Sequence, residues 1–389
     1  MTKIRAGQRA INSLPLHEEY SMEGTARVPY SHQKGPAEYF QIALDAIKKV
    51  TGVDIAPDQE ARLLIEAGKM CELLGEWDQA LESYKRAQKL SESDEIKAEA
   101  LKQTGHVWSK RGKWEAALEA YEASLEVLNR LGNLSEAGNI YNNIGYNYFE
   151  TGDVTKAKRY YDKALEIAQQ CDDDQLTADV QNNLGILSNV RGQTDEAAAH
   201  YRQSMIGYEA IGDIHGLAQA YHNLAMTYVD KEHWESAGEH YQKSMDLCMQ
   251  LGDLGFLSII YANRARLALH LHDPFVAKEY CDKAFGIFSK TGDKLGTAQV
   301  YKLYGIIHSD MQEWDSAETS FQKGIQVCEE CDNPLTKAEI YYELGSMNRK
   351  RYEKKEALDY MQKAVEIYEA LGADREVGKI RDEIRAMAV

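Results

Sequence analysis

The stretch Ile140–Ala164, IYNNIGYNYFETGDVTKAKRYYDKA, contains a spacing of small and aromatic residues that recurs along the chain. Its skeleton is Gly145, Gly152, Ala157, Tyr161 and Ala164. Forty residues later the same order returns as Gly185, Gly192, Ala197, Tyr201 and Ser204. The leading small residue recurs further along and upstream as Gly68, Gly105, Ala225, Ala265, Gly305 and Gly345. Eight copies of one unit therefore span about Ala61 to Leu371.

Each copy predicts two helices that pack against each other. The first half of the quoted stretch has a stripe with i, i+3, i+4, i+7 spacing, made of Tyr141, Ile144, Gly145 and Tyr148. The second half has an answering stripe of Ala157, Tyr161, Ala164 and Leu165. Gly152-Asp153 between them predicts the turn. A fixed period of this size indicates a stack of helix pairs rather than a globule.

This skeleton resembles the tetratricopeptide repeat in a forty-residue form. Turns stand where the shorter repeat has a proline, at Gly132-Asn133, Gly212-Asp213, Gly252-Asp253 and Gly292-Asp293. The resemblance implies an all-α fold, a right-handed superhelical solenoid of eight helix-turn-helix repeats with a capping helix at each end.

The regular period leaves no room for a domain boundary inside the repeats, so one elongated domain is expected. Residues 1–35 are polar and interrupted by Pro and Gly, and we expect an irregular tail there. An amphipathic helix beginning at Pro36 is expected to cap the first repeat within segment 36–60. The repeats then occupy 61–372, and a capping helix occupies 373–389.

Composition limits the classes of partner. The formal net charge is −17, whereas binding of nucleic acid or anionic lipid needs a basic surface. The sequence contains no apolar run of eighteen residues, so no membrane span is expected. Six cysteines scattered over different repeats favour a reducing compartment, and the cytoplasm is the expected location.

No motif indicates catalysis or a bound metal. Cys328 and Cys331 form a single CxxC without a second pair or neighbouring histidines, so thiols on a helix are the favoured interpretation. Phosphate-binding glycine loops, GxSxG and HExxH are absent from the sequence. The expectation is a non-enzyme without cofactor or metal.

An asparagine ladder is the candidate binding feature. In tetratricopeptide arrays the first helix of each pair lines a concave groove, and the residue two places before the small anchor points into it. Here that place holds Asn143, Asn183, Asn223 and Asn263. An amide offers a donor and an acceptor together, which suits the backbone of an extended peptide. The alternative is that these amides bond only to a neighbouring helix. With adjacent groove positions, the predicted peptide-binding residues are Asn142, Asn143, Tyr146, Asn182, Asn183, His222, Asn223, Asn263, Arg266 and Lys302.

Two functions follow from the resemblance. The ladder with its flanking basic residues resembles the Pins/LGN and kinesin light chain arrays, which implies a scaffold or adaptor that holds an extended or helical partner segment. The array also resembles peptide-sensing regulators of the Rap type, in which a ligand changes the pitch and controls a signalling partner. Residues 1–60 contain no recognisable effector domain, which favours the scaffold. The sequence leaves the oligomeric state open.

Overall fold

A computed structural model describes residues 56–388 of the chain. Every regular element among these residues is an α-helix, so the predicted all-α repeat solenoid is confirmed. The predicted tail of residues 1–35 and the predicted capping helix that begins at Pro36 lie outside the described residues.

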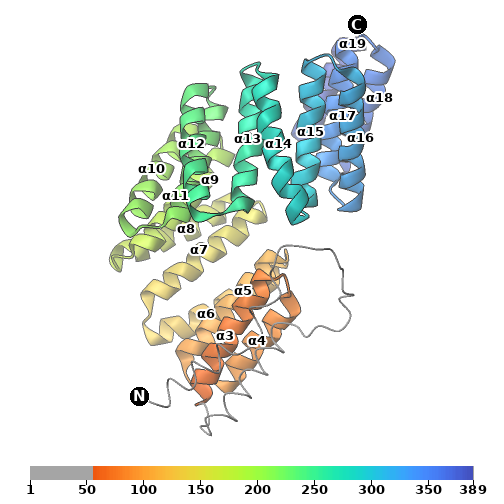
Figure 1. Ribbon diagram of the computed structural model, residues 1–389. Coiled ribbons are helices and arrows are strands. Elements are labelled where there is room, and N and C mark those ends of the chain that lie inside the picture. Colours follow the sequence, from red (N-terminus) through yellow and green to blue (C-terminus); the bar gives the residue numbers. More distant parts are fainter. Residues whose placement is uncertain (1–55, 389) are drawn as a thin grey trace, which may run out of the picture. The chain divides into compact units, whose positions relative to one another are not determined.

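The chain divides into two compact units, the first ending at Asn183 and the second beginning at Leu184. The described part of unit 1 consists of antiparallel helices stacked in pairs (Figure 1). Its helices are α3 (Pro57–Leu73), α4 (Trp77–Leu90), α5 (Asp94–Lys110), α6 (Trp114–Leu131), α7 (Leu134–Glu150), α8 (Val154–Gln170) and the first part of α9 (Asp174–Val190). The limits given above for the repeats, 61–372, and for the end segments, 36–60 and 373–389, remain predictions.

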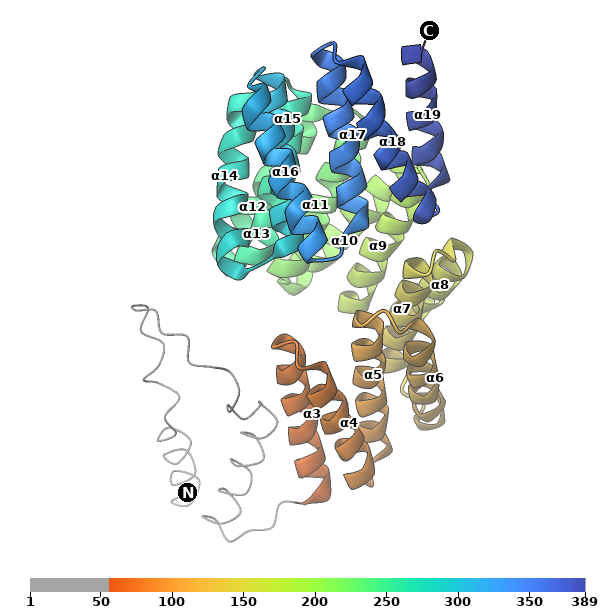
Figure 2. The ribbon, with the colours of Figure 1, turned by 90° about the vertical axis from the view of Figure 1, so that its right-hand side faces the viewer.

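Unit 2 continues the same pairing from the rest of α9 onward. Figure 2 shows its last helix, α19, beside α18, against which it packs. The helices are α10 (Thr194–Ile211), α11 (Ile214–Asp230), α12 (Trp234–Leu251), α13 (Leu254–His270), α14 (Pro274–Thr291), α15 (Lys294–Asp310), α16 (Trp314–Glu330), α17 (Pro334–Lys350), α18 (Lys354–Ala370) and α19 (Asp374–Ala388).

The Gly-Asn and Gly-Asp pairs of the sequence join one helix pair to the next. Gly132 ends α6 in the left-handed conformation, with φ of 69°, which glycine adopts without a steric penalty. Asn133 then begins α7, because its side chain accepts a hydrogen bond from the backbone N–H of Glu136. The same arrangement recurs at Gly212-Asp213, Gly252-Asp253 and Gly292-Asp293.

The small and aromatic skeleton is the contact between the two helices of a pair. A Cβ atom added to Gly145 would lie 2.7 Å from the ring of Tyr161, which is fully buried. The fifth and sixth repeats have alanine in place of this glycine, at Ala225 and Ala265, and in the sixth Cys281 also replaces the aromatic ring; Ala265 and Cys281 are fully buried.

Successive first helices of the pairs also touch each other. In unit 1, α3 packs beside α5 and α5 beside α7, and in unit 2, α13 packs beside α15 and α15 beside α17. We call their surface the first-helix face, made of α3, α5, α7 and the start of α9 in unit 1, and of α11, α13, α15 and α17 in unit 2. Every residue predicted to bind a peptide belongs to these first helices.

Candidate functional site

Four of the predicted residues share one cavity on the first-helix face of unit 1. Asn142, Asn143 and Tyr146 of α7 and Asn183 of α9 line a space of about 640 Å³. The other lining residues come from α5, α6, α7 and the turn between α5 and α6, and are His106, Ser109, Lys110, Gly112, Trp114, Tyr121 and Glu150. The cavity therefore combines amides, aromatic rings and charges of both signs.

The side-chain amides in this cavity make only some of their possible hydrogen bonds within the protein. The side-chain N–H of Asn183 donates to the Oδ1 of Asn142 over 2.9 Å, so a hydrogen bond ties α9 to α7. Among residues 56–388, neither the Nδ2 of Asn142 nor the amide of Asn143 has a protein partner. Asn182 differs from these residues, because it is 7% exposed and does not line the cavity. The hydrogen bond between the Asn183 and Asn142 side chains thus orients these amides and still leaves hydrogen-bond donors and acceptors for a ligand.

The carboxylate of Glu72 on α3 holds the imidazole of His106. The Nδ1 of His106 lies 2.9 Å from Glu72 Oε2, and the other oxygen of Glu72 accepts a hydrogen bond from the Tyr84 hydroxyl. Burial and this bond to Glu72 raise the pKa of Tyr84. Since Nδ1 is engaged, Nε2 is the ring nitrogen left for a ligand. The sequence prediction omitted His106, although it stands forty residues before Tyr146 and therefore at the same place of its repeat.

Cations on the first helices differ in whether an acidic side chain pairs with them. Lys102, Lys302, Arg349 and Lys350, for example, each lie within 3.0 Å of a carboxylate, in the pairs Lys102–Glu99, Lys302–Glu339, Arg349–Glu383 and Lys350–Asp310. Within residues 56–388, Lys110 and Arg266 make no ion pair. Lys110 lines the cavity described above, and Arg266 lines a smaller one in unit 2. Both of these unpaired cations share a cavity with a ladder asparagine.

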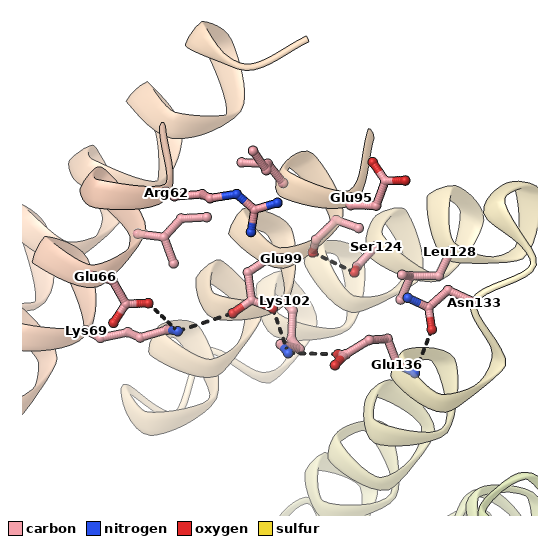
Figure 3. A pocket seen from close by; sticks show the side chains of 13 residues that line it. Arg62, Glu66, Lys69, Glu95, Glu99, Lys102, Ser124, Leu128, Asn133 and Glu136 are labelled. Atoms are coloured by element: carbon pink, nitrogen blue, oxygen red, sulfur yellow. Dashed lines mark hydrogen bonds and ion pairs between the residues drawn. The ribbon is translucent and has the colours of Figure 1, made fainter. Parts of the chain in front are cut away.

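In the neighbouring cavity of unit 1, of about 360 Å³, both lysines are paired with carboxylates (Figure 3). A row of alternating charges runs across α3, α5 and α7, through Glu66, Lys69, Glu99, Lys102 and Glu136. Lys102 lies 2.7 Å from Glu99 and 2.9 Å from Glu136. The lysines here are already engaged, so this row joins the helices and presents no free cation.

The predicted residues of unit 2 form a second amide cluster. His222 of α11 is 6% exposed, its Nε2 lies 2.8 Å from the Nδ2 of Asn263 on α13, and its Nδ1 lies 3.4 Å from the Oδ1 of Asn223. Burial lowers the pKa of His222 to about 4, so it is a neutral structural group at neutral pH. Lys302 is also largely buried, and its ammonium lies 2.6 Å from Glu339.

Two further features bear on the class of protein. Among the residues that the structure describes, no three His, Cys, Asp or Glu side chains are arranged to hold a metal ion. None of the helices described is both long enough and apolar enough to cross a membrane.

Comparison with known families agrees with the repeated helix pairs. Sequence models of the tetratricopeptide repeat match residues 63–96, 136–210, 176–250, 256–330 and 338–371, which together exceed half of the chain. The chain belongs to the tetratricopeptide repeat family. No curated protein sequence matches this tetratricopeptide repeat protein significantly.

Solved structures with similar folds cover most of the chain. The apo form of the quorum sensor NprR from B. thuringiensis is 15% identical, covers 85% of this chain and 93% of its own, and has a TM-score of 0.65. Aspartyl phosphate phosphatase F from Bacillus subtilis is 13% identical, with 89% and 96% covered and a TM-score of 0.62. A Rap protein complexed with competence and sporulation factor is 16% identical, with 85% and 98% covered and a TM-score of 0.55. At these identities the likeness concerns the fold.

Proposed function

We propose that this tetratricopeptide repeat protein is a non-catalytic scaffold that binds an extended segment of a partner protein on its first-helix face. The observation that carries the proposal is the cavity shared by Asn142, Asn143, Tyr146 and Asn183. Its amides are oriented by a hydrogen bond across two helices and retain unpaired donors and acceptors. The peptide groups of an extended segment require this pair of functions at each residue.

The remaining cavity residues define the kind of segment. Tyr146 is 44% exposed and Trp114 is half-buried, so both offer apolar surface to a side chain. Lys110 attracts an acidic group, while Glu150 accepts a hydrogen bond from the Tyr146 hydroxyl and limits the positive charge. A segment of mixed or mildly acidic character with apolar anchors matches this lining.

The net charge and the cysteines bear on the class of partner and on the cellular compartment. A net charge of −17 opposes nucleic acid as the partner. The six cysteines, all within the described residues, are free thiols, as expected in a reducing compartment, and we place the protein in the cytoplasm.

The test is selection of random dodecapeptides on the wild-type chain, followed by fluorescence anisotropy with the enriched peptides. The double variant Asn143→Ala/Asn183→Ala should bind these peptides at least tenfold more weakly, because two backbone-reading amides are removed. Its melting temperature should remain within a few degrees of the wild type, since both side chains are only half-buried.

The matched control is Asn129→Ala, which removes an exposed amide from α6, away from the cavity. This variant should bind the peptides as the wild type does. Equal affinity of the wild type and the double variant for every enriched peptide would contradict the proposal, and so would the enrichment of no peptide.

A second candidate is a peptide-sensing regulatory receptor. The observation that favours it is the likeness, over 85% of this chain, to the structures of a quorum sensor and of a Rap protein complexed with competence and sporulation factor. In such a receptor the ligand must select one of two conformations. Small-angle X-ray scattering with a saturating enriched peptide separates the candidates, because a receptor changes its scattering profile on binding and a rigid scaffold keeps it.

A further inference from the structure

A small cavity on α11 and α13 of unit 2 has the composition of a site for one side chain. Met226, Val229 and Leu267 supply its apolar walls, and its volume is about 60 Å³. One water-sized sphere needs about 10–15 Å³ on this measure, so the cavity holds roughly four to six such spheres. The branched side chain of leucine or isoleucine has four carbon atoms, which matches that capacity.

Two charged side chains that also line this cavity do not pair with each other. Asp230 and Arg266 both line the cavity, yet among residues 56–388 neither makes an ion pair or a side-chain hydrogen bond. A carboxylate accepts from a peptide N–H, and a guanidinium donates to a peptide carbonyl. The two charges therefore fit the two peptide groups that flank a single residue of an extended chain.

Asn263 also lines the cavity, and a hydrogen bond with the buried His222 fixes the orientation of its side chain. Its Nδ2 lies 2.8 Å from the Nε2 of His222, a nitrogen that must accept because Nδ1 faces the carbonyl oxygen of Asn223. The ring of His222 packs against Tyr241 and Phe256, which hold the imidazole in place. The Oδ1 of Asn263 and one of its N–H groups remain for a ligand. His222 is a positioning residue here, since it is buried and does not line the cavity.

We infer that this cavity is a specificity site for one aliphatic residue, Leu, Ile or Val, in an extended peptide. Arg266 and Asn263 bind the carbonyl side of its backbone, and Asp230 binds an N–H group. The inference rests on the proposed function only in taking an extended peptide as the ligand of the first-helix face. It concerns a different cavity in a different unit, so the two can fail separately.

The experiment uses the full chain with methyl-labelled Val and Leu and records the NMR signals of Val229 and Leu267. The probe is a blocked pentapeptide with leucine at its centre and alanine elsewhere, and the comparison peptide contains five alanines. Both signals should shift saturably with the leucine peptide. The alanine peptide should bind at least tenfold more weakly, because a pocket that is left unfilled by even one methylene typically loses about 10–200-fold.

Two variants test the assignment of the cavity. Met226→Trp places a large side chain at a position that is 38% exposed, and it should abolish the preference for leucine. Arg266→Gln removes the exposed guanidinium and should weaken binding of the leucine peptide severalfold. The matched control is Met249→Trp, because Met249 is 51% exposed on α12 and lies outside the cavity.

Absence of saturable shifts at Val229 and Leu267 would overturn the inference, as would equal binding of the two peptides. An unchanged leucine preference in Met226→Trp would overturn it too. These outcomes are independent of the dodecapeptide test on the Asn143→Ala/Asn183→Ala variant. Unchanged peptide affinity of that variant, together with the expected shifts here, would refute the unit 1 site alone.

Discussion

His222 is a histidine whose environment selects the neutral form. It is 6% exposed, its ring contacts two aromatic side chains, and both of its nitrogens face amides. Desolvation is the main cause that lowers its pKa to about 4, and the hydrogen bond to Asn223 opposes the shift. Protonation would place a second donor opposite the N–H of Asn263, so acid should weaken this junction of α11 and α13.

The first prediction is a loss of stability in acid that depends on this imidazole. The unfolded chain takes up the proton below its ordinary pKa of about 6.5, whereas the folded chain takes it up only near 4. Between these values the unfolded state binds more protons, so the free energy of unfolding decreases as the pH falls. The shift corresponds to roughly 3 kcal/mol when complete, and above about pH 6.5 this group contributes no pH dependence.

Urea unfolding of the wild type and of His222→Gln at pH 7 and pH 4.5 measures the effect. The decrease in unfolding free energy between the two pH values should be smaller in the variant, by about 2 kcal/mol. The control His233→Gln replaces an exposed histidine and should behave as the wild type. If His222→Gln loses as much stability in acid as the wild type, the buried neutral histidine is not the cause. A ring titration by NMR should also give a midpoint near 4.

At the scale of the helix, packing repeats from one pair to the next. A lysine of the second helix lies over a tyrosine ring of the first in five repeats, and each pair is separated by twenty-two residues. These are Tyr141–Lys163, Tyr221–Lys243, Tyr261–Lys283, Tyr301–Lys323 and Tyr341–Lys363, with distances from 3.8 to 5.9 Å. An exposed contact of this type contributes about 0.5–1 kcal/mol. The tyrosines thus do more than fill the space between helices.

The sequence predicts contacts that lie within one helix pair, and it does not predict hydrogen bonds between two successive helix pairs. The contact of Gly145 with Tyr161 and the turn at Gly132 follow from spacing inside or just beyond one repeat, and both are present. The bonds Asn142–Asn183 and His222–Asn263 join residues forty-one apart, so they depend on the lateral offset between successive first helices. No periodicity specifies that offset. The predicted ladder places the asparagines on the right helices, but it could not tell which amide groups remain available.

The second prediction concerns the charge row that joins α3, α5 and α7. Lys102 contacts Glu99 and Glu136, and its side chain is 19% exposed. Burial disfavours its charge, but the two carboxylates more than compensate and raise its pKa. In Lys102→Met both acids lose their partner, so the variant should be destabilised by about 1–3 kcal/mol.

A double-mutant cycle of Lys102→Met with Glu136→Gln should show a coupling energy of about 0.5–3 kcal/mol in urea unfolding. The matched control is the pair Lys278–Asp282 on α14, which is about half exposed and should couple by less than about 0.5 kcal/mol. Equal coupling in the two cycles would mean that the row adds nothing beyond ordinary surface pairs.

At the scale of the whole molecule, the contacts between the described helices of unit 2 are local to the stack. Within unit 2 the contacts join consecutive helices and first helices one pair apart, for example α13 with α15 and α15 with α17. Stability in such an array is a sum of repeat and interface contributions rather than one cooperative quantity. A local defect should therefore weaken its own pair and the adjoining ones and leave distant pairs unchanged.

The third prediction tests this with Gly345→Val in α17. A Cβ atom there would lie 2.6 Å from the buried side chain of Met361 and 3.1 Å from the backbone oxygen of Ala357, so the variant is overpacked. Overpacking costs about 1–3 kcal/mol, which corresponds to roughly 5- to 150-fold faster amide exchange in α17 and α18 when local opening limits exchange. Exchange in α11 and α12 should change less than about twofold, because they pack against α10 and α13, which stand several helices before α17 in the stack. The control Gly286→Ala adds a Cβ in open space within α14, so it should leave exchange unchanged or slow it slightly. Equal acceleration throughout unit 2, measured by mass spectrometry of exchanged peptides, would show that the stack unfolds as a single block.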